Sequence, residues 1–200
     1  MKKRLLALAV ILMMLISLLP VTTFAETPES VKVSLYSAIK GTTRTFEIGA
    51  DGGETFVVYK DEDFVKGDES ADSYIKLSYS SGVLDITLNK MNYTRTNNKN
   101  STFFKTPADN YDINLNIEGT NDINTQCSGG TNAGFYFQNT GDLTISGSGT
   151  LNLNVDAYSN ATSAISKSAD GNITIQNTTV NITGSGKSNV NGLYLKGAGN

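Results

Sequence analysis

Residues 141–154 read GDLTISGSGTLNLN, two short runs of alternating apolar and polar residues joined by a glycine–serine turn. The same pattern occurs as YDINLNIEGTNDIN from Tyr111 and as GNITIQNTTVNIT from Gly171, each 30 residues from the central copy. Each copy is followed by a third short run, which reads GFYF, AISK or GLYL. Self-similarity at a fixed period of about 20–50 residues is typical of proteins built from stacked repeats. The sequence therefore predicts a stack of similar coils.

Alternation with a period of two places every second side chain on one face of a strand. No segment of residues 82–200 has helical spacing, and Asn, Thr, Ser and Gly dominate between the apolar positions. Three short parallel strands per coil make a parallel β-helix. The predicted fold is therefore all-β, a parallel β-helix of about four coils of 28–30 residues. An antiparallel sandwich is the alternative, and it does not predict one register kept across three strands.

Residues 1–25 have the pattern of a Sec-type signal peptide, with a basic start, an apolar run over residues 5–19 and a small-residue cleavage site. That run is shorter than the ~20 residues of a spanning helix, so we expect a secreted or cell-surface protein without a membrane anchor after cleavage. An uncleaved anchor is the alternative. Residues 26–81 do not fit the 30-residue register and are predicted to form a β cap or an irregular first coil. The β-helix is predicted over residues 82–200.

Charge and composition narrow the classes of partner and of function. Signal cleavage leaves 13 Lys and Arg against 19 Asp and Glu, a net charge of −6, which argues against a nucleic-acid partner. Glycoside hydrolysis needs clustered carboxylates, whereas the outward columns here carry Asn, Thr and Ser. The chain has no histidine, and no arginine follows Arg95. We therefore expect a protein that is not an enzyme, and a polysaccharide lyase or hydrolase is the alternative.

Three outward columns contain the candidate site residues. Asn92, Asn124, Asn152 and Asn181 are predicted to form an asparagine column on the second strand, either as a hydrogen-bonded ladder or as ligand contacts. On the third strand Phe104, Tyr136 and Tyr194 fall at or near one outward position, where rings could stack on sugars or simply lie on the surface.

Asp112 and Asp142 recur at the corner that enters the first strand, and Asp170 lies near the same corner. Asx residues suit corners for local reasons, because they bond nearby backbone. The alternative is calcium, since carboxylate and amide oxygens beside carbonyls suit a hard cation. We name these three aspartates as the candidate calcium ligands.

The runs GVLDITLNKMNYT (82–94), INLNIEGTNDIN (113–124) and GDLTISGSGTLNLN, followed by SAISK and GNITI, resemble the β-helical carbohydrate-binding domain of secreted Gram-positive bacterial proteins. The resemblance covers about residues 82–200. It implies a right-handed parallel β-helix, bound calcium, binding of acidic or cellulosic plant polysaccharide, and no catalysis.

The sequence as a whole predicts a secreted, non-catalytic protein that binds extracellular polysaccharide through stacked outward polar and aromatic columns. A structural or adhesive cell-surface β-helix is the alternative from another functional class. Asn200 falls where another strand is due. We therefore expect either that the natural chain continues or that this end pairs with another molecule, as in end-to-end self-association.

Overall fold

A computed structural model describes residues 27–37, 41–95, 102–127, 132–157 and 162–196. Within these ranges the regular structure consists of β-strands, without a helix. None of these residues lies in a helix long and apolar enough to cross a membrane. The predicted signal peptide, residues 1–25, lies outside the described residues.

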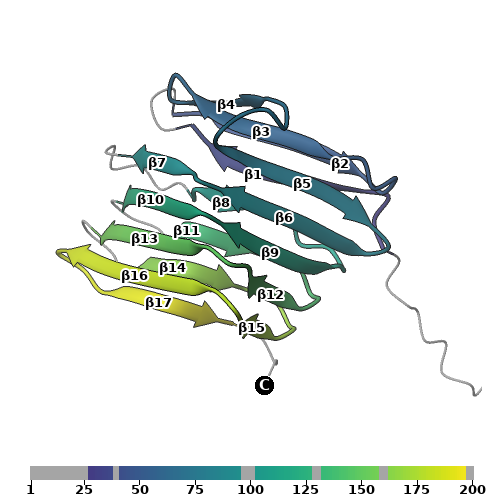
Figure 1. The fold of residues 1–200 in the computed structure, drawn as a ribbon. Coiled ribbons are helices and arrows are strands. Elements are labelled where there is room, and N and C mark those ends of the chain that lie inside the picture. Colours follow the sequence, from purple (N-terminus) through teal and green to yellow (C-terminus); the bar gives the residue numbers. More distant parts are fainter. Residues whose placement is uncertain (1–26, 38–40, 96–101, 128–131, 158–161, 197–200) are drawn as a thin grey trace, which may run out of the picture.

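Three sheets surround one core, and the coils stack from the N-terminal to the C-terminal end (Figure 1). Sheet A has the strand order β17-β14-β11-β8-β1-β2, sheet B has β15-β12-β9-β6-β5-β3-β4, and sheet C has β16-β13-β10-β7. The strands are β1 Ser30–Tyr36, β2 Thr43–Gly49, β3 Thr55–Lys60, β4 Asp63–Lys66, β5 Tyr74–Ser80, β6 Val83–Asn89, β7 Asn92–Arg95, β8 Phe104–Lys105, β9 Asp112–Glu118, β10 Thr120–Cys127, β11 Asn132–Phe137, β12 Leu143–Ser146, β13 Thr150–Ala157, β14 Thr162–Lys167, β15 Ile173–Ile175, β16 Thr179–Gly186 and β17 Val190–Leu195.

From β6 onward the chain is a parallel β-helix, which confirms the predicted fold class. Each turn of the chain adds one strand to sheet B, one to sheet C and one to sheet A, and each of these strands pairs in parallel with its equivalent in the next layer. Four layers stack, so the chain makes three full turns between β6 and β15. The repeat seen in the sequence is thus one complete turn of the backbone.

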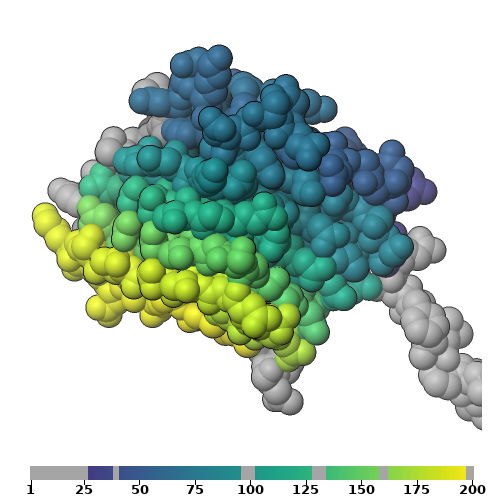
Figure 2. Space-filling view, in the orientation of Figure 1, coloured from purple at the N-terminus to yellow at the C-terminus, as the bar shows by residue number. Residues whose placement is uncertain are grey.

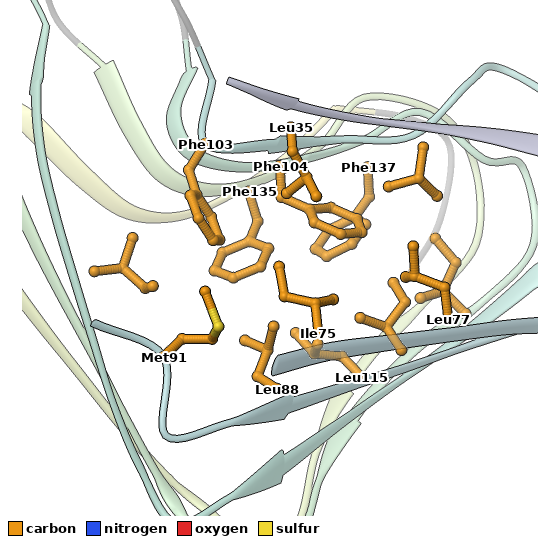
Figure 3. Close-up of a cluster of buried hydrophobic side chains, with 14 of the residues drawn as sticks. Leu35, Ile75, Leu77, Leu88, Met91, Phe103, Phe104, Leu115, Phe135 and Phe137 are labelled. Atoms are coloured by element: carbon orange, nitrogen blue, oxygen red, sulfur yellow. The ribbon is translucent and has the colours of Figure 1, made fainter. Parts of the chain in front are cut away.

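Inward side chains form files, where a file is a set of residues at equivalent positions on neighbouring strands. In sheet B one file is Leu84, Ile113, Leu143 and Ile173. Its first three members are at most 1% exposed. Figure 3 shows the apolar side chains that meet inside the coil, with phenylalanines on one side and aliphatic residues opposite. Burial of each such side chain contributes about 1.5–3 kcal/mol, so stacking itself stabilises the fold.

The glycine–serine turn is explained by the close stacking of the coils. Gly147 has a φ of +124°, and a Cβ atom placed there would lie 2.2 Å from the carbonyl oxygen of Ile117 in the layer before. Only glycine fits, because it has no Cβ and adopts positive φ without strain. The turn therefore marks where one layer rests directly on the next.

Residues 30–80 form antiparallel strands that precede the first parallel layer. β1 and β2 continue sheet A, and β5, β3 and β4 continue sheet B. The β5–β6 hairpin turns through Ser81 and Gly82, both with positive φ, as a two-residue type I′ turn requires. This hairpin reverses the chain from the antiparallel strands into the solenoid.

The antiparallel strands also close the N-terminal end of the core. Phe64 on β4 is 2% exposed and packs on Tyr93 and Phe103, with ring centroids 5.8 and 5.9 Å away. The edges of sheets A and B are joined by Arg44 of β2, whose Nε and Nη2 donate to the carboxylate of Asp63 on β4 at 3.0 and 2.5 Å. We call this arrangement the closed end.

Candidate functional site

The outer face of sheet C consists of polar side chains. This sheet C face is defined by the outward residues of β7, β10, β13 and β16, which are Asn92, Thr94, Thr120, Asp122, Asn124, Gln126, Thr150, Asn152, Asn154, Asp156, Thr179, Asn181, Thr183 and Ser185. Twelve of these fourteen carry an amide or a hydroxyl, and the other two are carboxylates. The face so defined contains neither an aromatic nor a basic side chain.

The first file of the face is Asn92, Asp122, Asn152 and Asn181. Asn181 Nδ2 donates to Asn152 Oδ1 at 2.9 Å, and Asn152 Nδ2 donates to Asp122 Oδ1 at 2.7 Å. The predicted column placed Asn124 in this file, and that assignment is wrong. Asn124 lies 32 rather than 30 residues after Asn92, so it falls in the neighbouring file and Asp122 takes its place.

Two further files run beside the first. In the second file Asn154 Nδ2 donates to Asn124 Oδ1 at 2.8 Å, and Asn124 Nδ2 donates to Thr94 Oγ1 at 3.3 Å. In the third file Gln126 Nε2 donates to Asp156 Oδ2 at 2.8 Å. Each amide has two N–H groups and an oxygen with two lone pairs, so these bonds do not exhaust its capacity. The files therefore connect the coils and still present polar atoms outward.

A hollow of about 260 Å³ lies between the second and third files. Its lining consists of Thr94, Arg95, Asn124, Thr125, Gln126, Asn154, Asp156 and Ser185. These residues come from β7, β10, β13 and β16, so the hollow crosses all four strands of sheet C. Strands lie about 4.8 Å apart, which makes the hollow roughly 14 Å long in the direction of the solenoid axis. We call it the sheet C hollow.

Arg95 supports the hollow from inside the coil. Its side chain is buried, its Nε and Nη2 donate to the carbonyl oxygen of Gln126 at 3.1 and 2.8 Å, and its guanidinium lies 5.3 Å from the ring centroid of Tyr36. Burial lowers the pKa of Arg95 from its ordinary value. The guanidinium therefore holds the backbone beneath the third file and is directed inward.

The corner aspartates bond from one layer to the next. Asp112 Oδ1 accepts a hydrogen bond from the backbone N–H of Asp142 at 2.8 Å. Asp142 Oδ1 in turn accepts from the backbone N–H and from Nδ2 of Asn172, at 2.8 and 3.1 Å. These contacts are those expected of Asx residues that satisfy nearby backbone groups at a corner.

The same corner contains a buried ammonium group. Lys167 is 0% exposed, and its Nζ donates to the backbone carbonyls of Asn139 and Asp170. Burial lowers the pKa of Lys167, and the nearby carboxylates of Asp142, Asp170 and Asp112 oppose that shift. The three predicted calcium ligands thus act electrostatically on one lysine. In the part of the chain that is described, no group of three or more His, Cys, Asp and Glu side chains is placed to hold a metal ion.

The predicted aromatic column is only partly outward. Tyr136 and Tyr194 occupy one outward file of sheet A, with Ser166 between them, and Tyr194 is 41% exposed. The prediction that Phe104 shares this position is wrong, because Phe104 is 0% exposed and lies in the inward file of Phe135. Since the asparagines are on sheet C and the tyrosines on sheet A, the predicted sugar-binding residues belong to two different faces.

Sequence reasoning missed Gln126, Asp156 and Arg95, although the alternation of β7 and β10 already assigns the first outward and the last inward. Comparison with known proteins found no matching family model, no matching curated protein and no matching solved structure. The resemblance to the carbohydrate-binding family is therefore supported only at the level of its β-helical fold.

Proposed function

We propose that this chain is a secreted, non-catalytic protein that binds a neutral, hydroxyl-rich polysaccharide on the sheet C face. The observation that carries the proposal is the sheet C hollow, which crosses four strands between two files of amide, hydroxyl and carboxylate groups. A glycan is a linear repeat, so a hollow lined by equivalent positions of successive coils can meet it unit by unit. Amides and hydroxyls both donate and accept hydrogen bonds, as sugar hydroxyls do.

The charges on the face favour a neutral glycan over an acidic one. Asp122 and Asp156 are the charged residues of the sheet C face as defined above, and both are negative. A uronate ligand would meet like charge there, because Arg95, the cation that lines the hollow, is buried and donates to the carbonyl oxygen of Gln126. Of the acidic and cellulosic polysaccharides that the sequence left open, we therefore propose the cellulosic one.

The two carboxylates are also poorly placed for glycoside hydrolysis. Asp156 and Asp122 stand four residues and one layer apart in register, which corresponds to roughly 14 Å. Glycosidases keep their two carboxyl groups about 5–9.5 Å apart. Each carboxylate also accepts a hydrogen bond from a neighbouring amide. These features support binding without catalysis.

The test is affinity electrophoresis of the purified chain in gels that contain soluble cellulose derivatives, xylan or polygalacturonate. The double variant N124A/N154A removes two amides that line the hollow, and we expect it to weaken binding to the neutral glycan at least tenfold. The matched control N152A/N181A removes two amides and two ladder bonds outside the hollow. We expect that control to bind as the unchanged chain does.

Absence of retardation by every glycan would overturn the proposed function, and equal loss in both double variants would move the site away from the hollow. The same gels with added EDTA test calcium, which stays a prediction for Asp112, Asp142 and Asp170. Asp112 and Asp142 each use Oδ1 in the corner contacts, so Oδ2 of each carboxylate can still face a cation.

A structural or adhesive surface module is the second candidate function. The ladder bonds favour it, because they join successive layers and so add rigidity to the stack. Under this reading N124A/N154A and N152A/N181A would lower the thermal midpoint to the same extent, and no glycan would retard the unchanged chain.

A further inference from the structure

Among the described residues that line the sheet C hollow, Asp156 carries the charge that faces outward. Arg95, the other charged residue of the lining, is directed into the coil. Asp156 is in register with Gln126 of β10 and Ser185 of β16, and Figure 2 shows the layers of these strands as successive bands from green to yellow. A carboxylate can only accept hydrogen bonds, so a ligand group that binds Asp156 must donate one.

The Asp156 carboxylate is held in place by the layers on both sides of it. From the layer before, Gln126 Nε2 donates to Asp156 Oδ2 at 2.8 Å, and the backbone carbonyl of Gln126 is itself fixed by Arg95. In the layer after, Gly186 has a φ of +104°, and a Cβ atom placed there would overlap Asp156 Oδ1. The carboxylate is therefore ordered before a ligand arrives, which lowers the entropic cost of binding.

The opposite wall of the hollow belongs to Asn154, two residues before Asp156 on the same strand. Asn154 Nδ2 donates toward the layer before, to Asn124 Oδ1 at 2.8 Å, whereas the third file donates toward the layer after, from Gln126 to Asp156. Two residues along a strand span roughly 7 Å. A sugar ring carries hydroxyls on opposite sides, so a single unit can reach the amide of one wall and the carboxylate of the other.

We propose that Asp156 determines the specificity of the sheet C hollow, because its carboxylate accepts hydrogen bonds from neighbouring hydroxyls of one sugar unit and repels a carboxylate in their place. The inference rests on the proposed function, and it narrows the ligand to neutral glycans whose units keep free neighbouring hydroxyls. Hydrogen bonds to a charged acceptor are roughly twice as strong as neutral ones. Like charges repel more strongly in a partly dehydrated hollow than in bulk water. Asp122, the other carboxylate of the face, lies in the first file, outside the lining.

The test is affinity electrophoresis in gels that contain hydroxyethyl cellulose or carboxymethyl cellulose, which share a glucan backbone and differ in the charge of the substituent. The measured quantity is the ratio of the two dissociation constants. Asp156→Asn removes the charge and keeps an oxygen that can accept from Gln126. We expect this variant to bind hydroxyethyl cellulose about tenfold more weakly, because the acceptor is no longer charged. Its binding to carboxymethyl cellulose should not weaken, because the repulsion is lost as well.

Asp85→Asn is the matched control for this variant. Asp85 Oδ1, on β6 of sheet B, also accepts from an amide of the next layer, Asn114 Nδ2, at 2.9 Å. The control therefore removes the same charge and the same kind of bond on another sheet, and we expect it to leave the ratio unchanged. Far-UV circular dichroism checks that both variants keep their sheets.

Salt gives a readout that does not depend on the folding of a variant. Between 0.01 and 1 M salt the Debye length falls from about 30 to about 3 Å, so repulsion between accessible charges is screened. For the unchanged chain we expect retardation by carboxymethyl cellulose to increase over this range, while retardation by hydroxyethyl cellulose stays constant. Constant retardation by carboxymethyl cellulose would overturn the inference.

The remaining outcomes separate the inference from the proposed function. Equal weakening toward both celluloses in D156N would mean that Asp156 only supports the ladder, which overturns the inference while the proposed function stands. A change of the ratio in D85N as large as in D156N would also overturn it, since net charge alone would then account for the preference. If neither cellulose retards the unchanged chain, the proposed function fails and the inference fails with it.

Discussion

The first and the last parts of the described solenoid differ in how the apolar core is covered. At the closed end the strands are antiparallel, and the buried ring of Phe64 packs on the aromatic residues at the end of the core. Hydrogen bonds from Arg44 to Asp63 join the edges of two sheets there. In the last described layer, β15, β16 and β17, which we call the open end, the apolar files and backbone edges are not covered by the described residues. The repeat thus specifies stacking only, and closing a stack needs residues that depart from it.

The largest expected effect on the free energy of unfolding concerns the aromatic side chain that covers the core at the closed end. Phe64→Ala should lower the free energy of unfolding by about 3–5 kcal/mol, because it opens a cavity among buried rings. Leu193→Ala at the open end should lower the free energy of unfolding by about 1 kcal/mol or less, since half of that side chain is already in water. Urea unfolding measures both losses. Equal losses would mean that the two ends do not differ as described.

An intermediate effect concerns pH, at the layer just beneath the open end. Lys167 lies in the file that ends with Leu195, and burial lowers its pKa. The unfolded lysine therefore binds a proton more tightly than the folded one, so stability rises with pH in the interval below 10.5. We expect the unchanged chain to gain stability relative to Lys167→Met as the pH rises toward 10.5.

Urea unfolding at several pH values measures this difference between the two proteins. The tyrosines with raised pKa values, such as Tyr59 at about 12, are common to both chains and cancel in the comparison. If the curves of stability against pH were parallel for the two proteins, the pKa of Lys167 would be the same in the folded and the unfolded chain, which would contradict the prediction.

The smallest effect distinguishes ladder positions by their distance from the open end. Asn152 both donates to Asp122 and accepts from Asn181, whereas Asn181 only donates. Asn152→Ala should therefore cost about 1 kcal/mol and Asn181→Ala about half as much. Thermal unfolding of the two variants checks the ratio, and a larger loss for Asn181 would contradict the ladder.

The repeats predicted the solenoid because alternation and period together fix which residues stack. The same reasoning misplaced Asn124, since two outward positions on one strand carry similar polar residues and only the register separates them. Phe104 was misplaced because β8 is only two residues long and the neighbouring Phe103 is buried as well. A strand this short has no alternating pattern from which the inward side chains could be assigned. Lys167 occupies an inward position only because its long stem reaches backbone carbonyls at the corner. The sequence named residues 26–81 as a cap or an irregular first coil, but the pairing of its strands could not be derived because that pairing does not repeat.

The polarity of the first ladder has a consequence for which groups its two ends can bind. Donation runs from the amide of Asn181, the last described rung, through Asn152 to the carboxylate of Asp122. A carboxylate can only accept, so two such rungs brought face to face would repel each other. An amide offers both kinds of partner atom. Asparagine at the last described rung can therefore pair with a further amide or hydroxyl through either of its polar atoms.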